Sequence, residues 1–243
     1  MALLPWQTAV LTRVEQETHN TRRFFFDVKD CERFDFIPGQ FITFDLPIHE
    51  KQSKRMRSYS VASWPQGNNQ FELLIVLLEG GAGTTYLFNE GKPGLEIPFR
   101  GPLGHFTLPE KMENDICLIC TGTGIAPFRS QVHYLFENKL PHSNIHLIFG
   151  SRYIKDLLYY NELKTLESQM EKFHFHVTLS REQSTEWKGG HGYVHQVYTQ
   201  LSENGNKPMD FYLCGWKAMV DDARAKIAAM GYPKENIHLE LYG

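Results

Sequence analysis

The chain has 243 residues, and its 25 Lys and Arg against 28 Asp and Glu give a formal net charge of -3. With 42% hydrophobic and 22% charged residues, it has the composition of a folded globular protein, which excludes a disordered chain. The weak charge and the lack of a long apolar run argue against nucleic-acid binding and membrane insertion. No signal peptide is evident, so a cytoplasmic location is expected. The oligomeric state stays open.

The N-terminal part of the chain predicts short β-strands separated by turn residues such as Pro38 and Gly39. One short helix is expected at about 84–89. Many short strands with little helical periodicity are typical of an antiparallel β-barrel. The expected strands are 7–14, 21–28, 41–46, 56–62, 71–78 and 95–99.

The pattern changes near residues 109–114, where apolar strands begin to alternate with amphipathic helical stretches. Such alternation favours a doubly wound parallel sheet. We therefore expect two domains, an N-terminal antiparallel β-barrel over residues 1–110 and an α/β domain over residues 111–243. The expected strands are 116–120, 145–149, 173–179, 211–214 and 237–241, and the expected helices are 128–138, 160–171, 194–201 and 218–230.

The four cysteines, Cys31, Cys117, Cys120 and Cys214, are too few and too scattered for a disulfide framework or an iron-sulfur cluster. Cys117 and Cys120 form a C-x-x-C within an apolar predicted strand, which favours small core residues over a redox or metal pair. The histidines show no ligand spacing of a known kind, so no metal site is expected.

Arg57-Ser58-Tyr59-Ser60 lies on one predicted strand. The two-residue period of a strand directs Arg57 and Tyr59 to the same side. Arginine can hold phosphate through two hydrogen bonds, and a tyrosine ring can lie against a flat cofactor. The segment indicates a ligand with a phosphate and an aromatic ring, although a solvated strand fits the same residues.

Two glycine-rich turns precede predicted helices. The first, 80–85, leads into the short helix, whose free amides favour an anion; a flexible connection capped by Thr84 is the alternative. The second, Gly122-Thr123-Gly124-Ile125-Ala126-Pro127, follows an apolar strand and puts Pro127 where a missing N–H costs little. It has the context of a dinucleotide phosphate loop without the full G-x-G-x-x-G pattern, and a bare glycine turn is the alternative.

Together with Tyr212-Leu213-Cys214-Gly215, these motifs resemble, in order, those of the ferredoxin-NADP reductase superfamily of flavoprotein electron transferases. That family shows an R-x-Y-S strand, a glycine turn with Ser or Thr that opens a short helix, a G-x-G-x-x-P loop and a C-G segment. The resemblance covers nearly the whole chain. It implies that the barrel binds FAD and that the α/β domain binds NAD(P)H, although FMN in place of FAD remains open.

For the flavin, the resemblance implies that Arg57 holds the phosphate, that Tyr59 packs along the ring and ribityl chain, and that Ser60 hydrogen-bonds near N5. The turn at Gly83 would cradle the pyrophosphate, and the backbone near Val76 would add contacts to the ring or ribityl chain. The implied flavin set is Arg57, Ser58, Tyr59, Ser60, Val76, Leu78, Gly83, Thr84 and Thr85.

For the nicotinamide nucleotide, the resemblance implies that Thr123 and Gly124 contact the ribose and pyrophosphate. Cys214 would approach the nicotinamide; its alternative is a small buried strand residue. The implied set at this end of the nucleotide is Gly122, Thr123, Gly124, Pro127, Cys214 and Gly215.

Ser180-Arg181-Glu182-Gln183 resembles the plant-type branch, in which serine and arginine bind the 2'-phosphate of NADPH. Tyr193 matches the tyrosine that stacks on the adenine. His191 stands where that branch has a lysine, and the surrounding glycines resemble oxygenase reductases that prefer NADH. NADPH is favoured, and NADH remains possible.

The end of the chain also resembles plant-type members, which finish in a glutamate, one apolar residue and a terminal tyrosine. Tyr242 would then cover the flavin and move aside for the nicotinamide, while Glu240 would position the nicotinamide or relay a proton. The extra Gly243 departs from the pattern, and a plain final strand is the alternative. The implied catalytic set is Ser60, Cys214, Glu240 and Tyr242.

The expected function is therefore hydride transfer between NADPH, or NADH, and FAD, with single electrons passed to or from an external carrier such as ferredoxin or flavodoxin. Lys51, Lys54 and Arg55 could dock an acidic carrier, or form an ordinary solvated loop. The alternatives are the reductase component of an oxygenase, a free-flavin reductase, and a non-enzymatic regulatory subunit of the same fold.

Overall fold

The structure is a computed structural model that describes residues 4–242. The chain forms two compact units. The first consists of Met1–Leu108 with Arg129–Tyr134, and the second of Pro109–Phe128 with Leu135–Gly243. Among residues 4–242, no helix has both the length and the apolar character needed to cross a membrane.

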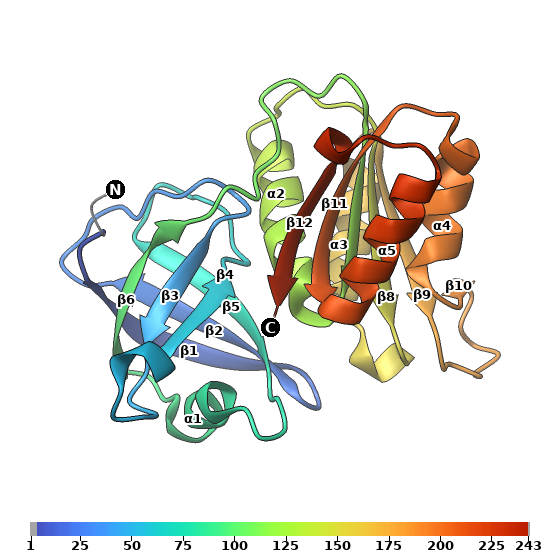
Figure 1. Cartoon of the computed structure of the whole chain (residues 1–243). Coiled ribbons are helices and arrows are strands. Elements are labelled where there is room, and N and C mark those ends of the chain that lie inside the picture. The colour runs from blue at the N-terminus through green and yellow to red at the C-terminus, as the bar shows by residue number, and fades with distance from the viewer. Residues whose placement is uncertain (1–3, 243) are drawn as a thin grey trace. The chain divides into compact units, whose positions relative to one another are not determined.

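The first unit is a six-stranded antiparallel barrel (Figure 1). Its strands lie in the order β4-β3-β6-β1-β2-β5, and a bridge between Val61 and Leu73 joins the two outer strands. The antiparallel β-barrel predicted from the sequence is confirmed. The strands are β1 (Gln7–Thr18), β2 (Thr21–Val28), β3 (Phe41–Asp45), β4 (Met56–Ser60), β5 (Gln70–Val76) and β6 (Glu96–Leu103).

Phenylalanine rings fill the interior of this barrel. Phe24 and Phe26 alternate along β2 and are fully buried, as the period of a strand requires when one face lines a core. The ring of Phe26 stacks on that of Phe71 at a centroid distance of 5.2 Å and packs against that of Phe44 at 5.3 Å. Each buried ring contributes about 2–3 kcal/mol through removal of apolar surface from water.

The segment after β5 differs from the prediction. The expected strand 71–78 ends at Val76, because the next residues form a turn: the Gly81 N–H donates to the Leu78 carbonyl at 2.9 Å, and the Leu78 N–H donates to Thr84 Oγ1 at 3.1 Å. Helix α1 (Ala82–Glu90) consequently begins two residues before the predicted start, with Gly81 as its extended N-cap.

The second unit is a parallel six-stranded sheet in the order β10-β9-β8-β7-β11-β12. From β7 the chain proceeds outward to β10, then crosses to β11 on the other side of β7. This arrangement confirms the doubly wound fold and puts the reversal of strand order between β7 and β11. The strands are β7 (Asp115–Thr121), β8 (Ile145–Ser151), β9 (Phe173–Leu179), β10 (Gly190–His191), β11 (Met209–Trp216) and β12 (Ile237–Tyr242).

Helices connect these strands. Helices α4 and α5 lie on one face of the sheet, where Val194, Tyr198 and Val220 pack against buried residues of β7 and β11 (Figure 1). Cys117 and Cys120 are fully buried in β7, and burial raises the pKa of both thiols. They lie in the core, where such thiols stay protonated and unreactive. The helices are α2 (Ile125–Glu137), α3 (Tyr160–Gln169), α4 (Val194–Leu201) and α5 (Lys217–Ala229).

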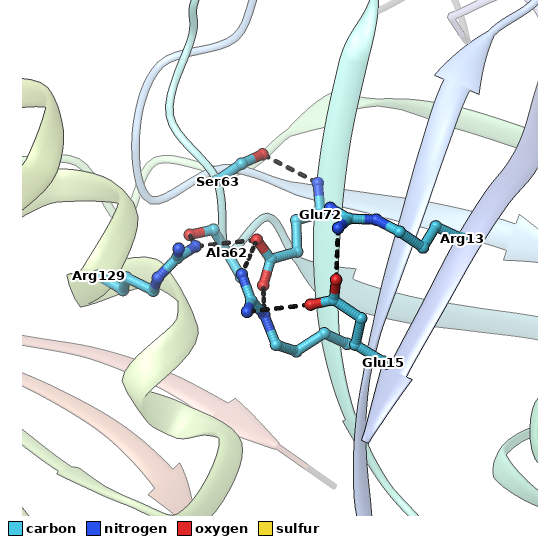
Figure 2. Close-up of polar contacts among 7 residues, drawn as sticks. Arg13, Glu15, Ala62, Ser63, Glu72 and Arg129 are labelled. Carbon is cyan, nitrogen blue, oxygen red and sulfur yellow. Dashed lines mark hydrogen bonds and ion pairs between the residues drawn. The ribbon is translucent and has the colours of Figure 1, made fainter. Parts of the chain in front are cut away.

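A buried carboxylate organises one side of the first unit (Figure 2). Glu72 on β5 is only 4% exposed, and its oxygens accept hydrogen bonds from Arg23 Nε at 2.6 Å and from Arg129 at 3.1 Å. Arg129, also 4% exposed, donates to the Ala62 carbonyl at 2.9 Å as well. Two guanidinium groups thus compensate one buried carboxylate, which is the arrangement that makes a buried charge tolerable.

Three histidines form a cluster on β8 and β9. His146 and His174 are paired in register, and their rings stack at a centroid distance of 4.8 Å. His146 Nδ1 lies 3.2 Å from His176 Nε2, and His146 is 8% exposed. Burial is the largest cause that lowers the pKa of His146 from 6.5 to about 4, and the neighbouring His176 and His174 lower it further. The charge of Asp115 opposes this shift, and that of Lys207 adds to it.

We expect this cluster to make the second unit sensitive to acid. Between pH 6.5 and about 4, the imidazole of His146 is neutral in the folded chain and protonated in the unfolded chain. Stability is therefore complete above pH 6.5 and falls as the pH drops toward 4, by on the order of 3 kcal/mol. Urea unfolding at a series of pH values measures this loss. His146→Asn should flatten the curve, and an unchanged acid dependence would exclude His146 as its source.

Candidate cofactor sites

The R-x-Y-S segment occupies β4 in the first unit. Arg57 Nη1 donates to the backbone carbonyls of Met56 at 2.7 Å and Lys54 at 3.1 Å, which holds the guanidinium at the start of the strand. Ser58 is exposed on the other side, where its hydroxyl lies 2.9 Å from that of Thr43. The strand therefore separates Arg57 from Ser58 as the two-residue period predicts.

Tyr59 is half-buried against the barrel core, with its ring centroid 5.9 Å from that of Phe44. Burial raises the pKa of Tyr59 to about 12, and the charge of Arg57 opposes this effect. The phenol is therefore a neutral donor at physiological pH. Ser60, at the end of the strand, is buried.

The structure brings Arg57 to helix α1. The aliphatic part of the Arg57 side chain lies over Gly83, where an added Cβ would be 2.9 Å from Arg57 Cγ. No side chain caps the N-terminus of α1. A guanidinium beside an uncapped helix start, with a glycine that admits close approach, fits the pyrophosphate of a flavin nucleotide.

The other residues of the implied flavin set lie around the same turn. Thr84 Oγ1 donates to the Gly81 carbonyl at 3.1 Å, and Thr85 is exposed on α1. Val76 ends β5, whereas Leu78 lies beyond the strand with both its backbone N–H and its carbonyl engaged in the turn. The expectation that Leu78 belongs to the strand is wrong.

Gly83 tests the link between the helix and the arginine. We expect Gly83→Ala to displace the Arg57 side chain, because contacts under 3.0 Å force one atom to move, and to weaken FAD binding about tenfold through a misplaced charge-assisted hydrogen bond. Titration of flavin-free protein with FAD measures this. Ala82→Ser, at an exposed position on the same turn of helix, should bind normally; equal affinity in both variants would refute the link.

In the second unit, the Gly122–Gly124 turn lies at the switch point of the sheet. It follows β7 directly, and α2 begins at Ile125. A Cβ on Gly124 would lie 2.4 Å from the Cys214 carbonyl oxygen, and a Cβ on Gly215 would lie 2.7 Å from Thr121 Oγ1. The ends of β7 and β11 therefore approach so closely that only glycine fits at these two positions.

A buried hydroxyl without a hydrogen-bond partner lies next to the Gly122–Gly124 turn. Thr121 Oγ1 is buried and has no hydrogen-bond partner among the described residues. Gly122 has a φ of +54°, in the left-handed region that favours glycine, and Thr123 is half-buried beside it. Pro127 lies in the first turn of α2, where its missing N–H leaves no helical bond unmade. A close backbone cradle at the carboxyl ends of strands suits a dinucleotide.

The C-terminal strand β12 lies next to β11 and brings further residues into register with Cys120 of β7. Parallel pairing places Cys120 opposite Cys214 and Cys214 opposite Glu240. Cys214 is fully buried and Glu240 is half-buried. The backbone of Tyr242 ends β12 opposite Trp216; the Tyr242 side chain and Gly243 lie outside the described part of the structure.

The predicted 2'-phosphate residues follow β9. Ser180 Oγ donates to the Ser151 carbonyl at 3.2 Å, and the Arg181 N–H donates to the Arg152 carbonyl at 3.1 Å, with the Arg181 side chain exposed. The short strand β10 pairs His191 with Leu179, immediately before Ser180. Tyr193, 69% exposed, is the N-cap of α4.

The sequence reasoning gave no role to Glu182, which shapes this loop. Its carboxylate accepts backbone N–H bonds from Ile154 at 3.0 Å and Ser184 at 2.9 Å, and these bonds lower the pKa of Glu182. The loop that presents Arg181 is thus fixed by the residue next to it. The only trace of this role in the sequence is the position of Glu182 directly after Arg181, the candidate phosphate-binding residue.

Comparisons with known proteins match each of the two units to a family of domains. The family model described as the oxidoreductase FAD-binding domain matches residues 8–108, and the oxidoreductase NAD-binding domain matches residues 118–225. The two domain matches define an FAD-dependent NAD(P)H oxidoreductase. A relative from Sorangium cellulosum, named ferredoxin-NADP reductase B, is 31% identical over 227 residues, which cover 91% of each chain. The chain belongs to the ferredoxin-NADP reductase superfamily.

Two further proteins illustrate the range of similarity. The anthranilate 1,2-dioxygenase electron transfer component of Acinetobacter baylyi is 31% identical over 96% of this chain but only 66% of its own length. This chain thus spans about two thirds of that oxygenase component. A ferredoxin NADP+ reductase from Neisseria gonorrhoeae, solved with FAD and NADP, shares the fold with a TM-score of 0.79 at 23% identity, over 97% of this chain and 98% of that one.

Proposed function

We propose that this protein transfers hydride between NADPH and FAD and exchanges single electrons with a ferredoxin- or flavodoxin-type carrier. When bound, FAD supplies the chemistry that converts a two-electron hydride step into one-electron steps. The observation that supports this most strongly is the close approach of Gly124 and Cys214 at the switch point of the second sheet. We assign residues 1–110 to the FAD-binding domain and residues 111–243 to the NAD(P)-binding domain.

In this proposal, Arg57 and the start of α1 hold the flavin pyrophosphate, with Gly83, Thr84 and Thr85 at the turn. Tyr59 remains protonated and offers its ring and hydroxyl to the cofactor, because the pKa of Tyr59 is raised to about 12. Ser60 hydrogen-bonds near the reacting flavin nitrogen. Ser58, Val76 and Leu78 complete the implied flavin set, with the Leu78 N–H already bonded to Thr84 Oγ1.

On the nucleotide side, the Gly122–Gly124 backbone receives the pyrophosphate and ribose, and Pro127 fixes the first turn of the following helix. Cys214 and Gly215 approach the nicotinamide. Glu240, in register with Cys214, positions the ring or relays a proton. Tyr242 is proposed as the residue that covers the flavin and moves aside for the nicotinamide.

We propose NADPH as the preferred coenzyme, with Ser180 and Arg181 at its 2'-phosphate and Tyr193 on the adenine. The exposed Arg181 side chain supports this, because a phosphate monoester attracts a free guanidinium. Arg181→Ala should raise KM for NADPH about tenfold or more and leave KM for NADH nearly unchanged. Steady-state kinetics with both nucleotides test this; an equal effect on the two would remove Arg181 from the phosphate site.

For the carrier, we propose docking of an acidic protein at the basic loop around Lys51 and Lys54, both of which are exposed. Arg55 contributes less, since its Nε lies 2.6 Å from Asp45 Oδ1. Turnover with a ferredoxin should fall with rising salt if this surface steers the carrier. The cytoplasmic location expected from the sequence stays a prediction.

The second candidate function is the NADH-dependent reductase component of an oxygenase. The 31% identity to a dioxygenase electron transfer component supports it. The two functions differ in the nucleotide that reduces the flavin faster and in the acceptor that is reduced fastest. Free-flavin reduction would show instead as flavin that dissociates readily during purification.

A further inference from the structure

Trp216 stands apart from the strand that carries it. It is the last residue of β11, whose preceding residues 211–215 are all buried, yet its own surface is 50% exposed. It is also the N-cap of α5, with extended backbone dihedrals of -62° and 133°. A single exposed aromatic residue is ordinary on a protein surface, so the exposure alone assigns no role.

The position of the indole gives Trp216 a specific neighbour. A Cβ on Gly122 would lie 3.3 Å from Trp216 Nε1 and 4.0 Å from Cδ1. The N–H edge of the indole therefore lies directly beside the first glycine of the turn at the switch point. Because Gly122 has no side chain, nothing on that residue shields the edge from a ligand that crosses the turn.

The indole N–H is an unused donor. Among the side chains that the structure describes, which leave out that of Tyr242, it has no hydrogen-bond acceptor, and the ring stacks on no other aromatic ring. The indoles of Trp187 and Trp64 differ, since Trp187 Nε1 donates to the Gly190 carbonyl at 2.9 Å and the Trp64 ring stacks on His133 at 4.1 Å. An indole nitrogen can only donate, so this edge offers a hydrogen bond to any acceptor that approaches it.

The neighbouring Lys217 does not compete with the indole N–H of Trp216 for a ligand at the Gly122 turn. Lys217, the next residue, lies 2.5 Å from Asp221 one turn along α5, so its ammonium is engaged along the helix. Among the described residues, the Lys217 ammonium pairs with Asp221 and not with the Gly122 turn. The oxygens of a nucleotide that crosses the turn would thus meet the indole N–H beside Gly122.

We propose that Trp216 is a nucleotide-contacting residue, whose indole N–H donates to an oxygen of the pyrophosphate-ribose segment of NAD(P)H as it crosses Gly122. The inference rests on nucleotide binding at this turn. The contact would add to the affinity for the nucleotide that the backbone of the turn provides. It would not distinguish a nucleotide with a 2'-phosphate from one without it. The contact is equally open to NADP+ and NAD+, because both carry the same pyrophosphate-ribose segment.

The test uses the full-length flavoprotein with oxidised nucleotide, so that no turnover occurs. The chain has four tryptophans, so a 15N-labelled sample gives four indole N–H signals, and Trp216→Phe identifies the one that belongs to Trp216. Saturation with NADP+ should shift this signal strongly. The Trp6 signal serves as the internal control, since Trp6 lies beside Arg100 in the first unit.

Calorimetric titration supplies the matching affinity. Trp216→Phe retains a ring and loses the donor, and it should weaken NADP+ binding about tenfold, as expected for one hydrogen bond to a charged group. Trp216→Ala should weaken it at least as much, with NAD+ affected by the same factor. Trp6→Phe should bind like the wild type.

Two results would overturn the proposal. An indole signal of Trp216 that does not move on saturation excludes the contact, and so does an affinity of Trp216→Phe within twofold of the wild type. Either result is distinct from a failure of the proposed function, in which the wild-type protein itself would bind neither NADP+ nor NAD+. Unchanged thermal unfolding of Trp216→Phe confirms that the variant is folded.

Discussion

Gly124→Ala is expected to abolish efficient reduction of the flavin by nicotinamide nucleotide while FAD remains bound. The added Cβ would lie 2.4 Å from the carbonyl oxygen of Cys214 and 2.7 Å from the Cα of Gly215. Both contacts involve backbone of β11, which pairs with β7 and β12 and cannot move away. The turn itself must therefore shift, and the cradle for the nucleotide shifts with it.

The expected size follows from the sensitivity of hydride transfer to position. A displacement of about 1 Å can cost ~100-fold in rate, so kcat/KM for the nucleotide should fall by about that factor or more. Gly122→Ala is the matched variant, since its Cβ would contact only the side chain of Trp216 at 3.3 Å. It carries the cost of a left-handed backbone but should be the milder of the two. Near wild-type kinetics for Gly124→Ala would contradict this account of the turn.

Of the substitutions predicted for this protein, Glu72→Gln should cause the largest fall in the free energy of unfolding. The substitution preserves shape but removes the charge that compensates Arg23 and Arg129, of which Arg129 is nearly fully buried (Figure 2). Removing one member of a buried ionic group typically costs ~3–5 kcal/mol, because an uncompensated charge remains. Chemical unfolding of the first unit measures this value.

Glu96→Gln is the control for that substitution. Glu96 accepts a hydrogen bond from Lys29 at 2.8 Å, but both side chains are about half exposed, so solvent screens the pair. Its loss should be too small to measure. A similar effect of the two variants would mean that burial does not set the strength of the Glu72 network.

The sequence predicted most of the architecture because local patterns determine it. The alternation along Thr21–Val28 and the unbroken apolar run in Asp115–Thr121 specify a strand with one buried face and a strand buried on both faces. Helix Val194–Leu201 has the predicted bounds. The cofactor turns were predicted for the same reason, since glycines and the proline after a strand are read from a few adjacent residues.

Features that depend on distant residues were not predicted. Glu72 meets Arg129 only because the fold joins positions 57 residues apart, and no local pattern announces such a pair. The sequence assigned no special role to His174 and His176, whereas the register of β8 and β9 brings them together with His146 in one cluster. Trp216 was not singled out because the role proposed for it depends on its distance from Gly122, in a different part of the chain.

The bounds of the turn after β5 were missed for a related reason. The apolar residues Leu77 and Leu78 continue the strand pattern, but side chain-to-backbone hydrogen bonding by Thr84 bends the chain and leaves both leucines exposed. Threonine competes with regular structure in this way when it lies just inside a helix. The pattern of hydrophobicity alone does not reveal whether the strand continues through Leu78 or the turn made by Thr84 ends it.

One chain is expected to bind both FAD and a nicotinamide nucleotide and to pass hydride between them. Anaerobic titration of the purified, flavin-loaded protein with NADPH and, separately, with NADH tests it most directly. The visible flavin absorbance should bleach with either nucleotide and faster with NADPH. Faster bleaching with NADH would reject Ser180 and Arg181 as the phosphate site, and a colourless protein that cannot be reconstituted with FAD would contradict the claim itself.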